Sequence, residues 1–581
     1  MTISASVLDC RRLTGPGLLL DRPGAVLDVR LDETDVERAI AAWHKAAGRL
    51  LADVGWEKET SVSRRFPGGV SLALTAPVDG LYAATEINER AWEAAAAELS
   101  RQPVVAPADV SALRRAVAEE RNPTLVSLQE RAAAHGLTFL IGEDQVSAGS
   151  GTGALVWAAD ALPDPATVDW RRAHDVPIAL VTGSNGKTTV VRLLAEMVRV
   201  GGRTPGYTTT DGVTVGTRLV EPGDFSGPSG ARMALRHPDV EVAVLETARG
   251  GILRRGLAVG RADVAVITNV AEDHLGEFGI ETLTQLADTK LVVGKALGDR
   301  GTIVLNADDP LLVERSARIR APVIWFSLDP ESPIVAGRLR NGGNAVIADG
   351  GSIVLARGER REAVVPVEQV PIAFQGTADH NIANALAAVA AATALGIGTR
   401  DLARALCRFG NQPGDNPGRA NLTEVGGVRV LIDYAHNPHG MLALVGLAKK
   451  LPAERRLVMV GQAGDRSDAA IRELARAAWS LKPDHIVVKD MAEFLRGRAP
   501  GEVPELLASE LHRMGAINEA VSRVGPDIEG VRLALEWARP GDLLVLAVHQ
   551  DRQAVQQLLD RLQADQWRAG QRLPLVAHSS G

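Results

Sequence analysis

The 581-residue sequence contains few cysteines and few aromatic residues. Its two cysteines, Cys10 and Cys407, are too few for a disulfide framework or for a zinc site built from cysteines. Phe, Trp and Tyr together make up 3% of the residues, which leaves little material for stacking the bases of a single-stranded nucleic acid. Because so few cysteines suit a reducing compartment, we expect a cytoplasmic protein.

The sequence also lacks a strong net charge and a long apolar run. Its 64 basic and 71 acidic residues give a formal charge of −7, which provides no basic footprint for nucleic acids or anionic membranes. The most extended apolar stretch, Ala385 to Ile397, is shorter than the roughly 20 residues that cross a bilayer. Charged residues also interrupt any signal-peptide core near the start: Asp9, Arg11, Arg12, Asp21 and Arg22. We therefore predict an enzyme that binds neither nucleic acid nor membrane.

The length predicts two to four domains, since a typical domain has about 150 residues. Residues 1–176 mix helical and alternating patterns, and a proline-containing linker ends them, so we predict an α+β N-terminal domain. Residues 177–416 alternate short β-branched runs with helical patterns, which predicts a parallel sheet covered by helices. After a loop at 410–417, residues 417–581 repeat this pattern in a smaller domain. The predicted fold class is α/β.

Eight short apolar runs are predicted to be buried strands. They lie at 178–182, 242–246, 264–268, 302–305, 428–432, 457–460, 486–488 and 543–547. The first four end in polar or Gly-rich residues. Ligands of open α/β sheets gather at the carboxyl ends of the strands, so we expect the functional site there.

The strongest local motif follows the first of these strands and opens a helix. It reads Thr182-Gly183-Ser184-Asn185-Gly186-Lys187-Thr188-Thr189. In such a loop, glycines let backbone N–H groups approach phosphate oxygens, and the helix N-terminus adds partial positive charge. Lys187 would reach the terminal phosphates, and the hydroxyl of Thr188 would bind Mg²⁺. Val181 stands where the general pattern has its first glycine. We predict an ATP site at residues 183–189.

Two further residues are candidates for the same metal site. Glu246 ends a predicted strand and offers a hard oxygen ligand for Mg²⁺, and His274 would complete the coordination. Taken alone, each residue also fits an ordinary structural position, namely a solvated strand end and a histidine with satisfied hydrogen bonds.

The phosphate loop resembles that of the Mur ligases, and later motifs resemble the Mur-like half of cyanophycin synthetases. These motifs are Gly230–Leu235, Glu246–Arg254, Asn269–Gly276, Leu305–Asp309, His380–Asn384, Pro417–Asn421, Asp433–Pro438, Gly464–Arg466 and Arg496–Arg498. The resemblance covers residues 177–550. It implies an ADP-forming ligase that activates a carboxylate as an acyl phosphate, with an ATP-binding domain at 177–416 and a Rossmann-like domain at 417–581.

The resemblance also implies roles for individual residues. Lys290 matches the lysine that is carbamoylated in most Mur ligases and supports a second Mg²⁺; Lys295 and a surface position for Lys290 are the alternatives. Asn381 would contact the adenine, Arg419 the nucleotide phosphates and Asp433 the ribose. The predicted catalytic residues are Lys187, His274, Lys290 and Arg419, and the predicted metal ligands are Thr188, Glu246 and His274. Asn381 and Asn384 precede a long Ala-rich helix, which makes N-capping the other interpretation of Asn384.

A cluster of charges in the C-terminal region is predicted to hold the amine substrate. It consists of Asp465, Arg466, Lys489, Asp490, Arg496 and Arg498. An amino acid carries an ammonium and a carboxylate, and both need partners of opposite charge. Each residue alone also fits a solvated surface charge. We expect an amino acid or an acidic peptide as substrate, and we leave open a homo-oligomer, either a dimer or a tetramer.

Cyanophycin synthetases contain an N-terminal domain, an ATP-grasp ligase and then the Mur-like ligase. Arg11–Pro16 resembles the start of the first domain, and residues 123–157 resemble the entry into the second. About twenty residues separate Trp157 from the strand at 178–182, whereas a domain needs ~100 residues. We therefore expect one ATP site and one type of amide bond.

Two alternatives stay open besides a cyanophycin-synthetase-like ligase. One is a Mur-type ligase that acts on a γ-glutamyl or cell-wall acceptor. The other is an inactive nucleotide-binding scaffold with a regulatory role. The sequence does not identify the two substrates, the role of residues 1–176, or whether a separate ATP-grasp partner supplies the substrate.

Overall fold

The computed structural model describes residues 5–100, 109–412 and 414–574. Contacts between residues divide the chain into two units. The first comprises Met1–Val270, Leu275–Val365 and Ala383–Leu406, and the second comprises Ala271–His274, Pro366–Ile382 and Cys407–Gly581. The N-terminal region and the middle region are thus grouped in one unit.

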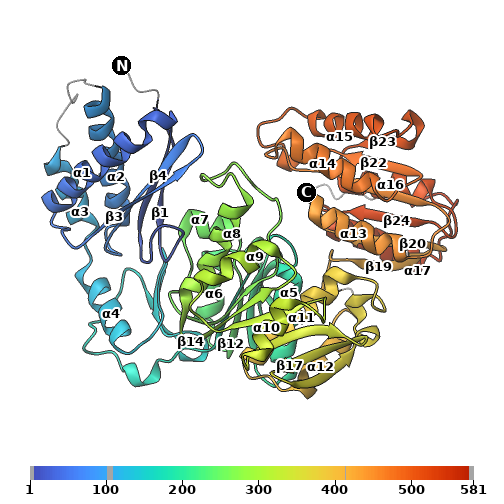
Figure 1. Ribbon diagram of the computed structural model, residues 1–581, viewed down its shortest axis with the longest axis horizontal. Helices are drawn as coiled ribbons and strands as arrows, with labels where there is room; N and C mark the ends of the chain where they lie inside the picture. Colours follow the sequence, from blue (N-terminus) through green and yellow to red (C-terminus); the bar gives the residue numbers. More distant parts are fainter. Residues whose placement is uncertain (1–4, 101–108, 413, 575–581) are drawn as a thin grey trace. The chain divides into compact units, whose positions relative to one another are not determined.

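The first unit begins with a four-stranded antiparallel sheet in the order β1-β2-β4-β3. Its strands are β1 (Ala5–Leu13), β2 (Gly24–Leu31), β3 (Ser61–Phe66) and β4 (Gly69–Thr75), and its helices are α1 (Val36–Asp53), α2 (Leu81–Ser100) and α3 (Val110–Glu120). Helices α1 and α2 cover one face of this sheet (Figure 1). In the core between them, Trp43 Nε1 donates to Asn88 Oδ1 at 3.0 Å, and Asn88 Nδ2 donates to Leu72 O at 3.0 Å. This pair fixes the helices against β4.

A small connecting module follows. It consists of α4 (Pro123–Ala134) and a three-stranded antiparallel sheet of β5 (Phe139–Ile141), β6 (Gln145–Ala148) and β7 (Leu155–Ala158). Between β7 and β8, which is Ile178–Thr182, the described residues form only a short 3₁₀ helix at Trp170–Arg172. The prediction that no further domain fits in this interval is confirmed.

The middle region contains an eleven-stranded sheet in the order β11-β10-β9-β12-β8-β13-β14-β15-β16-β17-β18. The strands after β8 are β9 (Pro205–Thr209), β10 (Gly212–Val215), β11 (Arg218–Pro222), β12 (Val242–Glu246), β13 (Ala262–Ile267), β14 (Leu297–Asn306), β15 (Val323–Ser327), β16 (Asn344–Asp349), β17 (Ser352–Arg357) and β18 (Arg360–Pro366). The seven central strands pair in parallel, in the order β9-β12-β8-β13-β14-β15-β16. The four runs predicted as buried strands here are β8, β12, β13 and the end of β14.

Helices surround this sheet because its central strands bury apolar side chains on both faces. They are α5 (Lys187–Val200), α6 (Pro228–Arg236), α7 (Arg249–Arg255), α8 (Leu283–Leu291), α9 (Pro310–Arg315), α10 (Pro333–Arg340), α11 (Asp379–Ala394) and α12 (Thr399–Arg408). Leu180, Leu245 and Ala265 belong to one apolar cluster with residues of α6 and α7. The sequence predicted a parallel sheet covered by helices. The structure confirms this for the central strands, whereas β10, β11 and β17 near the two edges pair antiparallel.

The second unit has a six-stranded sheet in the order β19-β20-β24-β21-β22-β23, with only β19 antiparallel. Its strands are β19 (Asn421–Val425), β20 (Val428–Asp433), β21 (Arg456–Val460), β22 (His485–Lys489), β23 (Val521–Val524) and β24 (Leu543–Ala547). Its helices are α13 (Pro438–Lys450), α14 (Asp468–Trp479), α15 (Glu502–Arg513), α16 (Asp527–Trp537) and α17 (Arg552–Ala564). Residue 413, in the predicted loop at 410–417, lies outside the described residues.

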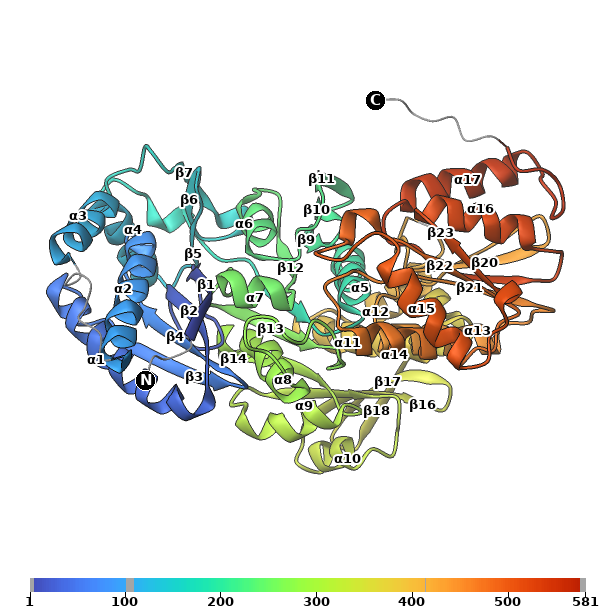
Figure 2. The ribbon, with the colours of Figure 1, turned by 90° about the horizontal axis from the view of Figure 1, so that it is seen from above.

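The helices of this unit lie on both faces of its sheet (Figure 2). Alternate residues of β21 separate the two cores, since Val458 packs with α13, α14 and α15 while Leu457 and Met459 pack with α16 and α17. This alternation follows from the two-residue period of a strand. The α/β fold class predicted for both domains is confirmed.

The helices and the cysteines bear on the expected setting of the protein. Among the described residues, no helix combines the length and the apolar composition that a membrane crossing would need. Cys10 and Cys407 are both free thiols, and burial raises the pKa of Cys10 to about 12.

Candidate active site

The predicted phosphate loop connects β8 to α5, which begins at Lys187 after the left-handed N-cap Gly186. Gly183 has a φ of +149°, and a Cβ atom there would lie 1.8 Å from Thr268 Oγ1. Gly186 has a φ of +85°, and a Cβ atom there would lie 2.1 Å from Asn384 Oδ1. Both positions therefore require glycine, for reasons of backbone conformation and of space.

Two residues at the end of β13 hold this loop in place. Thr268 Oγ1 donates to Asn185 O at 2.5 Å, and Asn269 Nδ2 donates to the same oxygen at 3.1 Å. In return, Asn185 N donates to Asn269 Oδ1 at 2.9 Å. Thr268 and Asn269 were not among the predicted site residues. Their position directly after a predicted buried strand could have indicated them, because this strand pairs in parallel with β8 and the ends of the two strands lie side by side.

Three of the side chains predicted to act on phosphate and metal, those of Lys187, Thr188 and Glu246, lie at the same sheet edge. Lys187 Nζ donates to Gly183 O and Ser184 O at 3.1 Å each, so its ammonium lies over the loop. Thr188 Oγ1 donates to Glu246 Oε2 at 2.9 Å. Glu246 ends β12 and is 1% exposed. The hydroxyl and carboxylate oxygens are hard ligands of the kind that Mg²⁺ prefers, and the loop at a helix N-terminus suits phosphate, so the residues present fit both groups.

The remaining loop residues are buried beside these. Ser184 is 1% exposed and Thr189 is 4% exposed. Ser184 N donates to Asn269 O at 3.0 Å, which ties the loop to β13 a second time.

Asn381 and Asn384 do not precede the Ala-rich helix, as the sequence suggested. Helix α11 begins at Asp379, so both residues lie within its first two turns, and N-capping by Asn384 is wrong. Asn384 instead lies beside Gly186 of the phosphate loop. Asn381 is 3% exposed, and its Nδ2 donates to Ile372 O at 2.9 Å.

Lys290 lies in α8 and is 2% exposed, which excludes the surface position that was its alternative. Lys295, the other candidate lysine, contacts residues near the start of the chain. Its Nζ donates to Gly17 O at 2.8 Å and pairs with Asp21 at 2.7 Å. A fully buried lysine is rare unless its charge is compensated or removed.

The second unit contains a charged cluster around Asp273 and His274, which belong to this unit by their contacts. An Arg466 guanidinium N–H lies 2.6 Å from His274 Nε2 and 3.5 Å from Asp273. A guanidinium only donates, so His274 Nε2 accepts in this contact. Burial raises the pKa of Asp273, but His436 at 3.6 Å and the charges of His274 and Arg466 outweigh burial and hold the pKa below its usual range.

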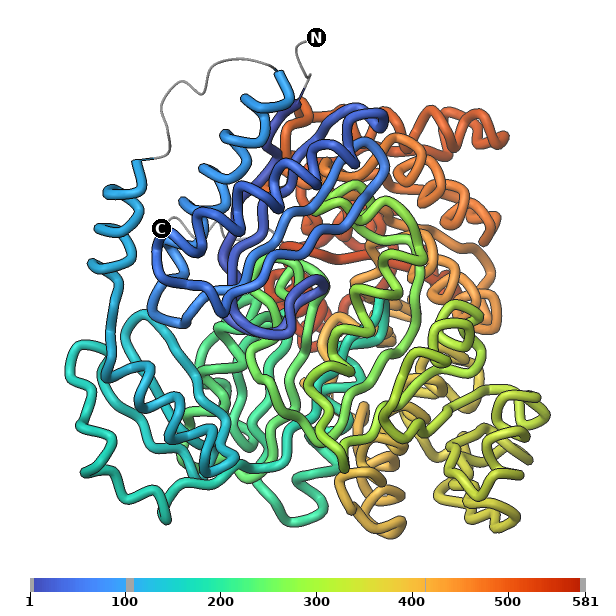
Figure 3. Tube along the Cα trace, turned by 60° about the vertical axis from the view of Figure 1, so that its left-hand side comes forward, coloured from blue at the N-terminus to red at the C-terminus, as the bar shows by residue number. Residues whose placement is uncertain are grey.

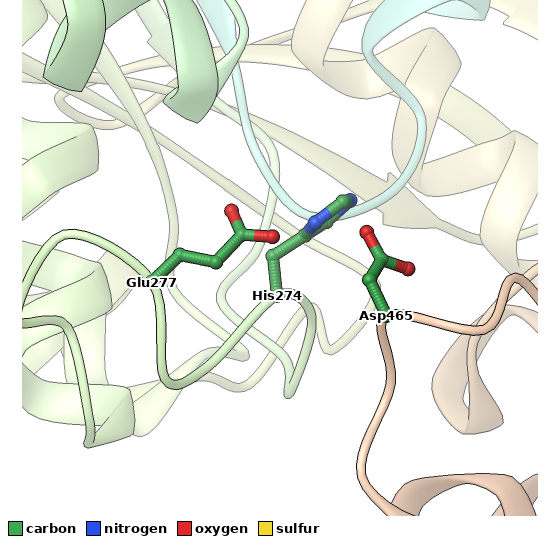
Figure 4. A group of neighbouring side chains, drawn as sticks. All are labelled: His274, Glu277 and Asp465. Carbon is green, nitrogen blue, oxygen red and sulfur yellow. The ribbon is translucent and has the colours of Figure 1, made fainter. Parts of the chain in front are cut away.

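Figure 4 shows the side chains of His274 and Asp465 of this unit, together with Glu277 from the first unit. A ring nitrogen of His274 and a carboxylate oxygen of Asp465 lie within 4.8 Å of each other. Glu277 forms an ion pair with Arg249 in its own unit.

Four of the residues predicted to hold the amine substrate are joined by contacts. Asp465 pairs with Arg466 at 2.7 Å and also with Arg496. Arg498 donates to Gly464 O and to Arg466 O, each at 2.8 Å. These residues follow β21 and β22, at the carboxyl end of the sheet. Asp490 accepts a hydrogen bond from Gly501 N at 2.6 Å and so shapes the same loop.

Lys489 is placed differently from the other five. Its side chain is 0% exposed and forms an ion pair with Asp527. Burial lowers the pKa of Lys489, and Asp527 opposes this effect. Asp527 Oδ2 also accepts from His549 N at 2.7 Å and from Gln550 N at 2.6 Å. The structure therefore gives Lys489 an interior position.

Arg419 and Asp433 flank Tyr434, an aromatic residue that the sequence reasoning did not single out. The guanidinium of Arg419 lies 4.4 Å from the centre of the Tyr434 ring. Asp433 Oδ2 accepts from Ala420 N and its Oδ1 from Ala435 N, both at 2.7 Å. The backbone thus orients this carboxylate.

Comparison with known proteins agrees with this geometry. The family model of the Mur ligase middle domain matches residues 181–392, and that of the Mur ligase glutamate ligase domain matches residues 418–548. The UDP-N-acetylmuramoylalanine–D-glutamate ligase of Pelotomaculum thermopropionicum is 31% identical over 374 residues, which are 64% of this chain and 70% of that protein. The chain therefore belongs to the Mur ligase family.

Cyanophycin synthetases, which are longer than this chain, share a higher sequence identity with it. The cyanophycin synthetase of Geminocystis herdmanii is 39% identical over 371 residues, which are 64% of this chain and 42% of that enzyme. The chain thus matches less than half the length of this relative. A solved bifunctional folylpolyglutamate synthase/dihydrofolate synthase with Mn, AMPPNP and L-glutamate bound has a TM-score of 0.49 and 17% identity, over 66% of this chain and 89% of that one.

Proposed function

We propose that this chain is an ATP-dependent carboxylate–amine ligase that releases ADP and phosphate. The contact between Thr188 and Glu246 carries the proposal, because it places two Mg²⁺-compatible oxygens 2.9 Å apart beside a phosphate loop. The 39% identity to a cyanophycin synthetase supports the same class of reaction.

The proposed reaction has two steps. A substrate carboxylate oxygen attacks the γ-phosphorus of ATP, the bond from that phosphorus to the bridging oxygen breaks, and ADP leaves. The amine nitrogen then attacks the acyl carbon, phosphate departs with the former carboxylate oxygen, and the nitrogen loses a proton. Negative charge gathers on the transferred group, so positioned cations are the main catalytic requirement.

The residues divide these tasks. Residues 183–189 would bind the phosphates, with the Lys187 ammonium as the point charge. Mg²⁺, held by Thr188 and Glu246, would neutralise phosphate charge when bound. The buried Lys290 is proposed to be carbamoylated, which would turn a buried cation into an anion that supports a second Mg²⁺. His274 is proposed as a further metal ligand from its motif.

The C-terminal residues would bind the other parts of the substrates. We assign Asn381 to the adenine, Asp433 to the ribose and Arg419 to phosphate, following their motifs. The linked charges Asp465, Arg466, Arg496 and Arg498 are the proposed amine pocket. Lys489 is left out because its charge is already paired inside the unit. The substrates would be an amino acid and an acidic peptide.

The test is a screen for substrate-dependent ADP release. The full chain is incubated with ATP and Mg²⁺, with free amino acids as amines and aspartyl or glutamyl peptides as carboxylates, and Lys187→Ala serves as the blank. We expect at least one pair to release ADP, and the variant to lose this activity by about a hundredfold, as for removal of a strong electrostatic contact.

Other outcomes identify the alternatives. UDP-linked muramoyl peptides are added to the same screen as a further set of carboxylates, and release only with these acceptors would indicate a Mur-type cell-wall ligase. Tight ATP binding without release in any combination would contradict the proposal and indicate a nucleotide-binding scaffold.

A further inference from the structure

We infer that the N-terminal sheet positions the loop directly after His274, and that Arg64 is the positioning residue. This inference rests on the proposed function, which makes His274, the residue directly before that loop, a metal ligand. It assigns a role to residues 1–176, for which the sequence offered none.

The two faces of the sheet differ, since one is apolar and the other carries charged residues beside a small apolar cluster that includes Leu13 and Val26. Helices α1 and α2 cover the apolar face. The opposite face carries Asp28, Arg64 and Ser71, because Ser71 of β4 pairs directly with Asp28 of β2 and with Arg64 of β3, and paired residues share a face. The charged face is therefore the one turned away from the helices of the N-terminal core.

This charged face is buried against the middle region. Arg11 is 8% exposed, and its Nε donates to Leu253 O in α7 at 2.7 Å. Its Nη1 pairs with Asp28 at 2.6 Å, and Asp28 is 1% exposed. Strand β1 runs beside α7, as the trace in Figure 3 and the ribbon in Figure 2 both show. The face is therefore anchored by a buried ion pair.

Arg64 extends from this face to the loop. Its Nη2 donates to Phe278 O at 3.3 Å and to Gly279 O at 3.2 Å. Phe66, two residues along β3, lies so close to Gly279 that a Cβ atom there would be 2.5 Å from its ring. The Phe278 ring also lies 4.8 Å from the guanidinium carbon of Arg11. One strand thus supports two consecutive loop residues.

The loop adopts a conformation that needs such support. Phe278 has a φ of 54° and Gly279 a φ of 64°, and left-handed backbone at a bulky residue persists only where its surroundings hold it. Gly276 N donates to Ile280 O at 2.8 Å, which closes the turn. On its other side, Glu277 pairs with Arg249. Because the turn begins two residues after His274, its conformation constrains the backbone that carries the imidazole.

The first test measures hydrogen–deuterium exchange in the full chain. Arg64→Ala is compared with Arg65→Ala, which removes the neighbouring arginine on the opposite face; Arg65 is 49% exposed and pairs with Glu37 at 2.9 Å. We expect at least tenfold faster exchange of the amides at 276–281 in Arg64→Ala, and wild-type exchange there in Arg65→Ala. Equal exchange in the two variants would overturn the inference.

The second test measures kinetics with the substrates found in the ADP-release screen. We expect Arg64→Ala to lower kcat by about ten- to a hundredfold, as for a slight misplacement of reacting groups, with the KM for ATP within about twofold. Arg64→Lys, which can reach one carbonyl, should recover part of kcat. Wild-type kcat in Arg64→Ala would overturn the inference, as would faster exchange throughout the first unit in both Arg64 variants. If the wild type releases no ADP, the proposed function fails while the exchange result still decides the role of Arg64.

Discussion

Two positions of the phosphate loop must be glycine because side chains distant in the sequence leave no space for a Cβ atom. Gly183 faces Thr268, and Gly186 faces Asn384. The sequence predicted these glycines from a motif alone, and the structure supplies the reason that they are needed. Thr268 and Asn269 were missed as partners of this loop, although Asn269 opens one of the quoted motifs, because their contacts with the loop depend on the parallel pairing of β13 with β8.

Gly183→Ala should damage the ATP site more than the fold. The new methyl group would collide with Thr268 Oγ1, and a φ of +149° costs a non-glycine residue about 1–3 kcal/mol. We expect ATP affinity, measured by isothermal titration calorimetry, to fall by at least about tenfold, which corresponds to ~1.4 kcal/mol. Gly260→Ala is the control, since nothing lies within 4 Å of its added Cβ. Equal ATP affinities in the two variants would refute this explanation of Gly183.

Lys489 shows what a sequence cannot reveal about a charged residue. It follows a strand near Asp490, and its type and position suited a substrate pocket. Whether its side chain turns to solvent or to the interior depends on Asp527, which lies 38 residues away. Removing one partner of a buried pair typically costs about 3–5 kcal/mol because the other charge is left buried without compensation, so replacing Lys489 would disturb the fold whatever the substrate is.

At the scale of elements, the strands were predicted well because they are short, apolar and flanked by polar or Gly-rich residues. The start of α11 was predicted poorly. Asn381 and Asn384 have the low helix propensity of cap residues, yet tertiary contacts override it, with Asn384 against Gly186 and Asn381 bonded to Ile372. Polar residues inside this helix therefore marked tertiary contacts rather than a helix end.

Helices α14 and α15 are linked by one carboxylate whose effect depends on pH. Hydrogen bonds from Arg513 lower the pKa of Glu510, burial opposes them, and Arg476 of α14 lowers it further, to about 2 from an ordinary 4.5. A carboxyl group with a lowered pKa in the folded state contributes stability above its unfolded pKa, and this contribution is lost as the pH falls toward the folded pKa.

Glu510→Gln should therefore destabilise the protein in a pH-dependent manner. We expect the difference in denaturant unfolding midpoint from the wild type to be full above about pH 5, and to shrink as the pH falls from 4.5 to about 2. Glu519→Gln, at an exposed position, serves as the control. A difference that is constant over this pH range would show that the charge of Glu510 is not what joins the two helices.

At the scale of the whole molecule, the fold class and the ligase domains could be predicted because each motif is local. The attachment of the N-terminal sheet could not, since it depends on contacts such as Arg11 with Leu253, which are 242 residues apart. A charged strand face normally indicates exposure to solvent. Here that face is buried, Arg11 pairs with Asp28, and Arg11 and Arg64 donate to backbone carbonyls of the middle region.

The central claim is that ATP activates a carboxylate as an acyl phosphate. The direct test supplies the acidic peptide identified in the screen with its carboxylates labelled with ¹⁸O, together with ATP, Mg²⁺ and the amine, and analyses the released phosphate by mass spectrometry. We expect one ¹⁸O atom in each phosphate and a product amide that has lost one labelled oxygen. Phosphate without ¹⁸O, released at the same rate as ADP, would mean that water rather than the carboxylate accepts the phosphoryl group, and would contradict the claim.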